Sequence, residues 1–156
     1  MTSSRANAEG PIVVGVYPGQ STLVINEGLV AAHESGHAIV FAHVRVTSYL
    51  TEWDTARQRR ETARRATTGE DAVLIAELTE VISGLADRGV SWTLRLIDGD
   101  PPKALVRLAD EVHASRIIVG SRGAGLVNAT GEWLSRSVAT RLIHLQHRPV
   151  TVVPVW

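Results

Sequence analysis

Three histidines and a glutamate lie close together in the stretch AAHESGHAIVFAHV, residues 31–44. His33 and His37 are four residues apart with Glu34 between them, and His43 follows six residues later. On a helix, two histidines at this spacing project from one face and can hold one Zn²⁺ ion. A glutamate beside them can act as general base towards the metal-bound water. If this stretch is helical, it predicts zinc-dependent peptide hydrolysis.

The full spacing H-E-x-x-H-x-x-G-x-x-H resembles that of the metzincin peptidases, and HESGHAIV is similar to the zinc helix of membrane-anchored AAA-type proteases. The metzincin pattern has glycine where this chain has Val40, because the backbone turns sharply there to bring the third histidine to the metal. Those enzymes also carry a methionine turn beneath the metal, whereas the only methionine here is Met1. A zinc peptidase is therefore an alternative that the surrounding sequence disfavours.

A strand over residues 38–46 is the competing prediction. AIVFAHVRV is rich in β-branched and aromatic residues, which is typical of a buried strand. Gly36 stands where helices commonly end. If the strand begins at His37, a rise of about 3.3 Å per residue places His37 and His43 roughly 20 Å apart, too far to share an ion. We therefore expect structural histidines and no metal site formed by them.

Composition limits the possible functions further. A chain of 156 residues predicts one domain, with a polar tail over residues 1–10 and the folded part over 11–156. Lys plus Arg and Asp plus Glu number 16 each, so charge gives no reason to expect nucleic acid or a membrane as partner. The chain has no cysteine, which excludes disulfides and thiol catalysis. The tail lacks a signal-peptide pattern, and we expect a cytoplasmic protein.

Short apolar runs alternate with segments of helical periodicity along the chain. We expect strands at 11–17, 38–46, 90–97, 116–120 and 149–156, and helices at 21–35, 70–87 and 132–147. The segment 98–114 opens with a Pro-containing turn and then becomes helical. On the first helix, Ile25, Gly28, Leu29 and Ala32 share one side, and Glu34 faces solvent. Strands that alternate with amphipathic helices indicate an α/β fold, with a parallel sheet covered on both faces.

The chain resembles the universal stress protein family in several segments that occur in the family's order. GDPPKALVRLADEVHASRIIVGSRGAG is similar to the family's Pro-containing turn, helix, strand and Gly-rich loop. SVATRLIHLQHRPVTVVPV is similar to its ending, and PIVVGVYPGQ to its first strand and turn. In this alignment His33 and Glu34 end the first helix, and His43 is a histidine that members often carry in the second strand. The resemblance covers about residues 11–155.

This resemblance implies a single-domain, open, five-stranded parallel sheet of the flavodoxin-like, adenine-nucleotide-hydrolase-like type, with strand order 3-2-1-4-5. Many members bind ATP where the strand order reverses, between strands one and four. ATP or another adenine nucleotide, with Mg²⁺ as the only metal, is the cofactor that the resemblance implies. The residues at the corresponding positions are Gly120, Ser121, Gly123, Gly125, Arg136, Ser137, Val138 and, after the first strand, Tyr17.

Three departures alter the implied pocket. Tyr17 replaces the family's aspartate, Arg136 replaces a glycine, and 12 residues rather than the family's nine separate Gly123 from that position. One interpretation is a nucleotide site that has become degenerate, in a stress-response or regulatory module without catalytic residues. The alternative is a functional ATP-binding switch or slow ATPase. A third interpretation is that the glycines serve only the turn and the close contact of strand and helix.

The sequence also predicts the character of two surface segments. The last strand would lie at an edge of the sheet, and family members commonly dimerise through it, so we expect a homodimer. The stretch RQRRETARR, residues 57–65, indicates a solvated helical face rather than a nucleic-acid patch, because aromatic residues are not interleaved and overall charge is balanced.

Overall fold

A computed structural model describes residues 10–46, 69–86, 89–121 and 135–155. The strands are β1 (Ile12–Gly15), β2 (Ile39–Val46), β3 (Trp92–Gly99), β4 (Arg116–Gly120) and β5 (Val150–Val153). The helices are α1 (Thr22–Ser35), α3 (Gly69–Leu85), α4 (Pro101–Glu111) and α5 (Ser135–Leu145). The predicted alternation is confirmed within these residues, and the predicted strand over residues 38–46 is confirmed as β2.

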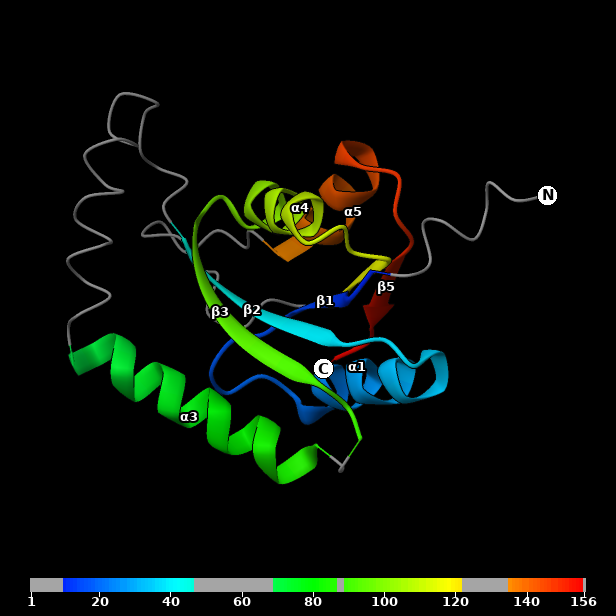
Figure 1. The fold of residues 1–156 in the computed structure, drawn as a ribbon. Helices are drawn as coiled ribbons and strands as arrows, with labels where there is room; N and C mark the ends of the chain where they lie inside the picture. The colour runs from blue at the N-terminus through cyan, green and yellow to red at the C-terminus, as the bar shows by residue number, and fades with distance from the viewer. Residues whose placement is uncertain (1–9, 47–68, 87–88, 122–134, 156) are drawn as a thin grey trace.

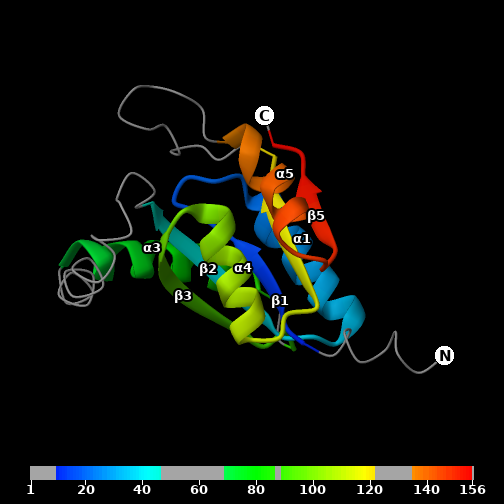
Figure 2. The same cartoon turned by 90° about the horizontal axis from the view of Figure 1, so that it is seen from above.

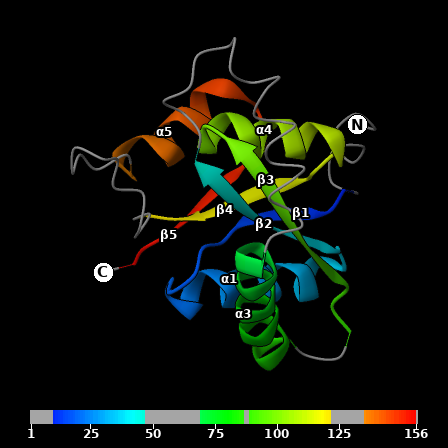
Figure 3. The same ribbon diagram turned by 90° about the vertical axis from the view of Figure 1, so that its left-hand side faces the viewer.

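The five strands form one parallel sheet in the order β3-β2-β1-β4-β5, as predicted. Helices α4 and α5 lie on one face, and α1 and α3 lie on the other (Figure 1; Figure 3). Strands β3 and β5 form the two margins of the sheet (Figure 2). Among the described helices, none combines the length and the apolar character needed to span a membrane.

Strand β1 is buried on both faces, which explains its uninterrupted apolar sequence. Ile12 and Val14 pack into the cluster under α1 and α3, whereas Val13 packs into the cluster under α4 and α5. All three are at most 1% exposed. Side chains alternate between the faces along a strand, so each core layer receives every second residue.

Helix α1 has a polar cap at its start and, as predicted, a glycine at its end. The Ser21 side chain accepts a hydrogen bond from the Leu23 amide at its start, and Gly36 ends it with a left-handed φ of 72°. The predicted inner side is buried and Glu34 is exposed. Gly28 faces β1 so closely that a methyl group there would lie 2.8 Å from Val14 Cγ2. A larger residue at position 28 would push α1 away from the sheet.

An ion pair joins the two helices on the other face. Arg141 of α5 donates to both carboxylate oxygens of Asp100, at 3.0 and 2.6 Å. Asp100 is the N-cap of α4, but its side chain caps no amide because Arg141 holds it. Pro101 and Pro102 follow at positions where helix amides need no carbonyl partner.

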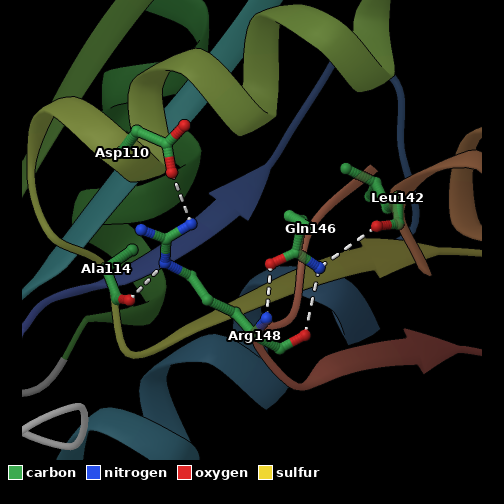
Figure 4. Close-up of polar contacts among 5 residues, drawn as sticks. All are labelled: Asp110, Ala114, Leu142, Gln146 and Arg148. Atoms are coloured by element: carbon green, nitrogen blue, oxygen red, sulfur yellow. Dashed lines mark hydrogen bonds and ion pairs between the residues drawn. The ribbon is translucent and has the colours of Figure 1, made fainter. Parts of the chain in front are cut away.

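At the amino ends of the strands, Gln146 and Arg148 fasten the segment that leads from α5 to β5 (Figure 4). Arg148 donates to the Ala114 carbonyl and to Asp110, both at 2.7 Å. The buried Gln146 amide donates to the Leu142 and Arg148 carbonyls and accepts from the Arg148 amide. These bonds tie the approach to β5 to the segment between α4 and β4.

At the carboxyl ends of β2 and β3, Arg45 gathers two carboxylates. Its guanidinium donates to Asp71 of α3 at 2.7 Å and to Asp98 of β3 at 3.0 Å. Its Nε also lies 2.7 Å from Asp98, as an ion-pair contact without the alignment of a hydrogen bond. Arg45 therefore fastens the start of α3 to this edge of the sheet.

Candidate functional site

The carboxyl ends of β1 and β4 form the candidate site. Strand β1 pairs with β2 on one side and with β4 on the other, so the chain leaves β1 and β4 towards opposite faces. In open parallel sheets, ligands bind beside the strand ends where the order reverses in this way. Tyr17 follows β1 and Ser121 follows β4, which places these two predicted residues at the same edge.

The turn after β1 runs from Tyr17 to Gln20. The Gln20 amide donates to the Tyr17 carbonyl at 3.2 Å, and the Tyr17 amide donates to Gln20 Oε1 at 3.4 Å. Gly19 has a φ of 75°, a conformation that glycine adopts without strain. A turn therefore follows the first strand, as the resemblance of PIVVGVYPGQ to the family's first strand and turn implies. It brings the Gln20 side chain back over the end of β1.

Gly120 closes β4 in a crowded position. A Cβ atom there would lie 3.3 Å from Gln20 Nε2, 3.3 Å from Val24 Cγ2 and 3.5 Å from Val155 Cγ2. These neighbours come from the turn, from α1 and from the residues after β5. The missing side chain therefore lets three segments of this chain approach β4, which supports the packing interpretation at this glycine.

Ser121 is engaged by the end of the chain. Its amide donates to the Val153 carbonyl at 2.8 Å, and its hydroxyl oxygen accepts from the Val155 amide at 2.9 Å. The hydroxyl also lies 3.4 Å from the Val155 carbonyl. A ligand that used the Ser121 hydroxyl would have to compete with the backbone of Val155.

The other predicted site residues have different placements. Val138 packs into the core between the sheet and the helices α4 and α5, so it is a packing residue in this structure. Arg136 and Ser137 belong to the first turn of α5 by their backbone. Gly123 and Gly125, like the arginine-rich stretch 57–65, lie outside the described residues.

The three histidines of the opening motif do not come together. His33 is exposed in the last turn of α1, and His37 follows that helix with Nδ1 3.3 Å from Ser115 Oγ. His43 lies in β2 with Nδ1 3.0 Å from the Val16 carbonyl. In the described part of the chain, no group of three or more metal-binding side chains is assembled. The arrangement offers no basis for H-E-x-x-H chemistry.

His43 also contributes to the candidate site, through a hydrogen bond to the backbone that the sequence did not predict. Because the Val16 carbonyl can only accept, Nδ1 carries the proton and donates. Burial lowers the pKa of His43; its bond to Val16 opposes this, and nearby Arg45 and Asp71 act in opposite directions. The ring is therefore neutral at pH 7 and holds the backbone just before Tyr17.

Two further residues at this edge, Gln20 and Val155, also escaped prediction. Gln20 is one polar residue in a turn, and no local pattern distinguishes it. Val155 reaches Ser121 from 34 positions along the chain. These contacts are tertiary, and only the sheet topology could have indicated them.

Comparison with known proteins gives consistent matches. Residues 10–154 match the family model described as "Universal stress protein family". A universal stress protein of Synechocystis sp. is 35% identical over 81 residues, which are 51% of this chain and 50% of that protein. The match thus spans about half the length of that curated relative.

Solved structures resemble this chain over nearly its full length. A universal stress protein from Archaeoglobus fulgidus has a TM-score of 0.59 at 22% identity, over 92% of this chain and 98% of its own. A universal stress protein from Archaeoglobus fulgidus in complex with dAMP has a TM-score of 0.58 at 21% identity, over 94% of this chain and 98% of its own. A universal stress protein in complex with cAMP has a TM-score of 0.58 at 21% identity, over 95% of this chain and 99% of its own. At these identities the likeness shows the fold.

Proposed function

Because the chain belongs to the universal stress protein family, we propose that it is a cytoplasmic stress-response module that binds an adenine nucleotide weakly and without catalysis. The observation that carries this proposal is the meeting of the Tyr17–Gln20 turn with Gly120 and Ser121 at the reversal of strand order. The relatives solved with dAMP and cAMP support an adenine nucleotide as the ligand class.

Weak binding follows from what the described residues already do. The amide and hydroxyl of Ser121 are bonded to Val153 and Val155, and the space beside Gly120 is filled by side chains. Polar groups that are bonded within the protein gain little by exchanging partners, so they add little net affinity. A nucleotide at this edge would rely on other donors, or would displace the end of the chain.

Titration tests this proposal. Purified protein is titrated with a fluorescent ATP analogue, with and without Mg²⁺, and then with ATP, AMP and cAMP as competitors. We expect saturable, competable binding in the high-micromolar to millimolar range, and amide shifts in NMR spectra centred on Tyr17, Gly120 and Ser121. The absence of any binding at millimolar nucleotide would contradict the proposal.

The second candidate is an ATP-dependent switch or slow ATPase. The observation that favours it is the position of Arg136 and Ser137 in the first turn of α5, since helix N-termini attract anions. A switch would retain nucleotide through purification, and an ATPase would release phosphate above the buffer rate. If the protein elutes free of nucleotide and releases no phosphate, the switch and the ATPase are excluded, and the weak, non-catalytic module remains.

We also propose a homodimer that forms through β5. This strand lies at the margin of the sheet, and its Val152 is 40% exposed. An apolar edge strand pairs readily with a second copy unless charge prevents it. Light scattering should give a dimer mass at micromolar concentration and a monomer mass for Val152→Lys. The variant Val73→Lys on α3, which is 59% exposed, serves as the control.

A further inference from the structure

The polar side chain of Gln20 lies between the two strand ends of the candidate site. Its Oε1 accepts from the Tyr17 amide after β1, and its Nε2 lies 3.3 Å from where a Gly120 side chain would begin. The residue is partly buried rather than free in solvent. The turn that closes over Gly19 fixes its backbone, so the side chain has a defined place between β1 and β4.

The two ends of the Gln20 amide differ in what they can still do. Tyr17 N–H can only donate, so it fixes the amide with oxygen on its side and nitrogen towards Gly120. Among the described residues, Nε2 has no hydrogen-bond acceptor, although it carries two donors. The carbonyl oxygen keeps a second lone pair. The amide thus retains the N–H donors of Nε2 and one acceptor position on Oε1, and its bond from Tyr17 fixes which end is which.

Within the described part of the chain, the side chains near Gln20 favour an uncharged partner. Ser21 and Ser121 are neutral, and His43 is neutral because burial lowers its pKa. The charged groups at the ends of β2 and β3 are paired with one another through Arg45. Neutral donors and acceptors of this kind suit a nucleobase better than a phosphate, which calls for cationic partners.

We infer that the Gln20 amide reads the base of the bound nucleotide and gives this site its preference for adenine. This inference rests on the proposed function. Adenine offers an amino donor beside a ring-nitrogen acceptor, which is the complement of an amide. Hypoxanthine carries a carbonyl in place of the amino group. An amide that Tyr17 prevents from flipping cannot match both bases.

The test compares ATP with inosine triphosphate, because the two differ only in the base. The wild type should bind ATP about threefold to tenfold more tightly, the worth of one or two neutral hydrogen bonds. Gln20→Ala should lose this preference, because its affinity for ATP falls while its affinity for inosine triphosphate stays unchanged. Gln20→Glu, which keeps the acceptors but loses the donor, should also lose it.

Asn26→Ala is the matched control, because it removes an exposed amide from α1. It should leave both affinities unchanged, and thermal melts show that each variant is folded. If Gln20→Ala keeps the wild-type ratio, or binds ATP more tightly, the base-reading role is wrong while nucleotide binding stands. If the wild type binds neither nucleotide at millimolar concentration, this inference and the proposed function both fail.

Discussion

Val155 donates its backbone N–H to the side-chain hydroxyl of Ser121, at 2.9 Å. The bond joins the residue after β4 to the segment after β5, and the Ser121 amide joins the same two segments through Val153. Ser121, which the family resemblance implies as a ligand contact, therefore also holds two segments of the sheet together. Its two possible roles predict different results for one substitution.

Ser121→Ala should lower the free energy of unfolding by about 1 kcal/mol, because the Val155 amide loses its acceptor. Nucleotide affinity should change less than twofold. Urea denaturation and the titration described above measure the two quantities. Ser35→Ala is the control, since its hydroxyl bonds only within α1, to the Ala31 carbonyl. A large loss of affinity with unchanged stability would show that Ser121 is a ligand contact instead.

Two glycine substitutions should have opposite signs. Gly28→Ala should destabilise the protein by about 1 kcal/mol net, because the clash with the stiff Val14 side chain outweighs the gain in helix propensity. Gly84→Ala in α3 meets no atom within 4 Å and should stabilise by up to about 1 kcal/mol. Equal effects in urea denaturation would mean that α1 does not need its close approach to β1.

The stability of the protein should decrease at acidic pH in a way that depends on His43. Burial lowers its pKa below the ordinary 6.5, so between the two values the unfolded chain binds more protons than the folded protein. Stability from this residue is then fully present above pH 6.5, and is lost as pH falls through the window below it.

His43→Asn tests this, because the asparagine amide nitrogen can replace Nδ1 as donor to Val16. Denaturation midpoints at pH 5 and pH 7.5 should differ less in the variant than in the wild type. Groups elsewhere titrate equally in both proteins, so the difference between them isolates His43. Identical pH dependence, or an NMR titration with an ordinary pKa, would contradict the prediction.

The Arg141–Asp100 pair should show a coupling of about 0.5–1 kcal/mol in a double-mutant cycle, because two parallel hydrogen bonds hold it. The coupling is small because Arg141 is 39% exposed and water screens the charges. The single contact between Arg95 and Glu111, which are 40% and 60% exposed, is the control. Its coupling should be smaller. Equal couplings would show that the two-bond geometry contributes nothing.

Strand and helix positions followed from the sequence because each depends on local pattern. The apolar runs 11–17 and 38–46 contain β1 and β2, and Gly36 ends α1 where its type and spacing indicated. Boundaries were less exact. The strand expected at 90–97 is β3 from Trp92 to Gly99, because pairing with all of β2 extends it to Gly99.

The candidate site was less predictable, because its contacts join residues far apart in the chain. Tyr17 and Ser121 do lie at the same end of the sheet, since they follow neighbouring parallel strands. Val138 is partly buried and packs against the core cluster between the sheet and the helices α4 and α5. The roles of Gln20 and Val155 depend on distances across the sheet, which no spacing along the sequence encodes.

The fastenings made by Arg148, Gln146 and the Ser115–Pro11 bond all lie at the amino ends of the strands. The rim opposite to Gln20 and Tyr17 therefore has fastenings of its own, in addition to those that Arg45 and Ser121 make at the carboxyl ends. Substitutions in the Tyr17–Gln20 turn leave these amino-end bonds intact. Such a scaffold can vary in the turn after β1 over evolution and still keep its architecture.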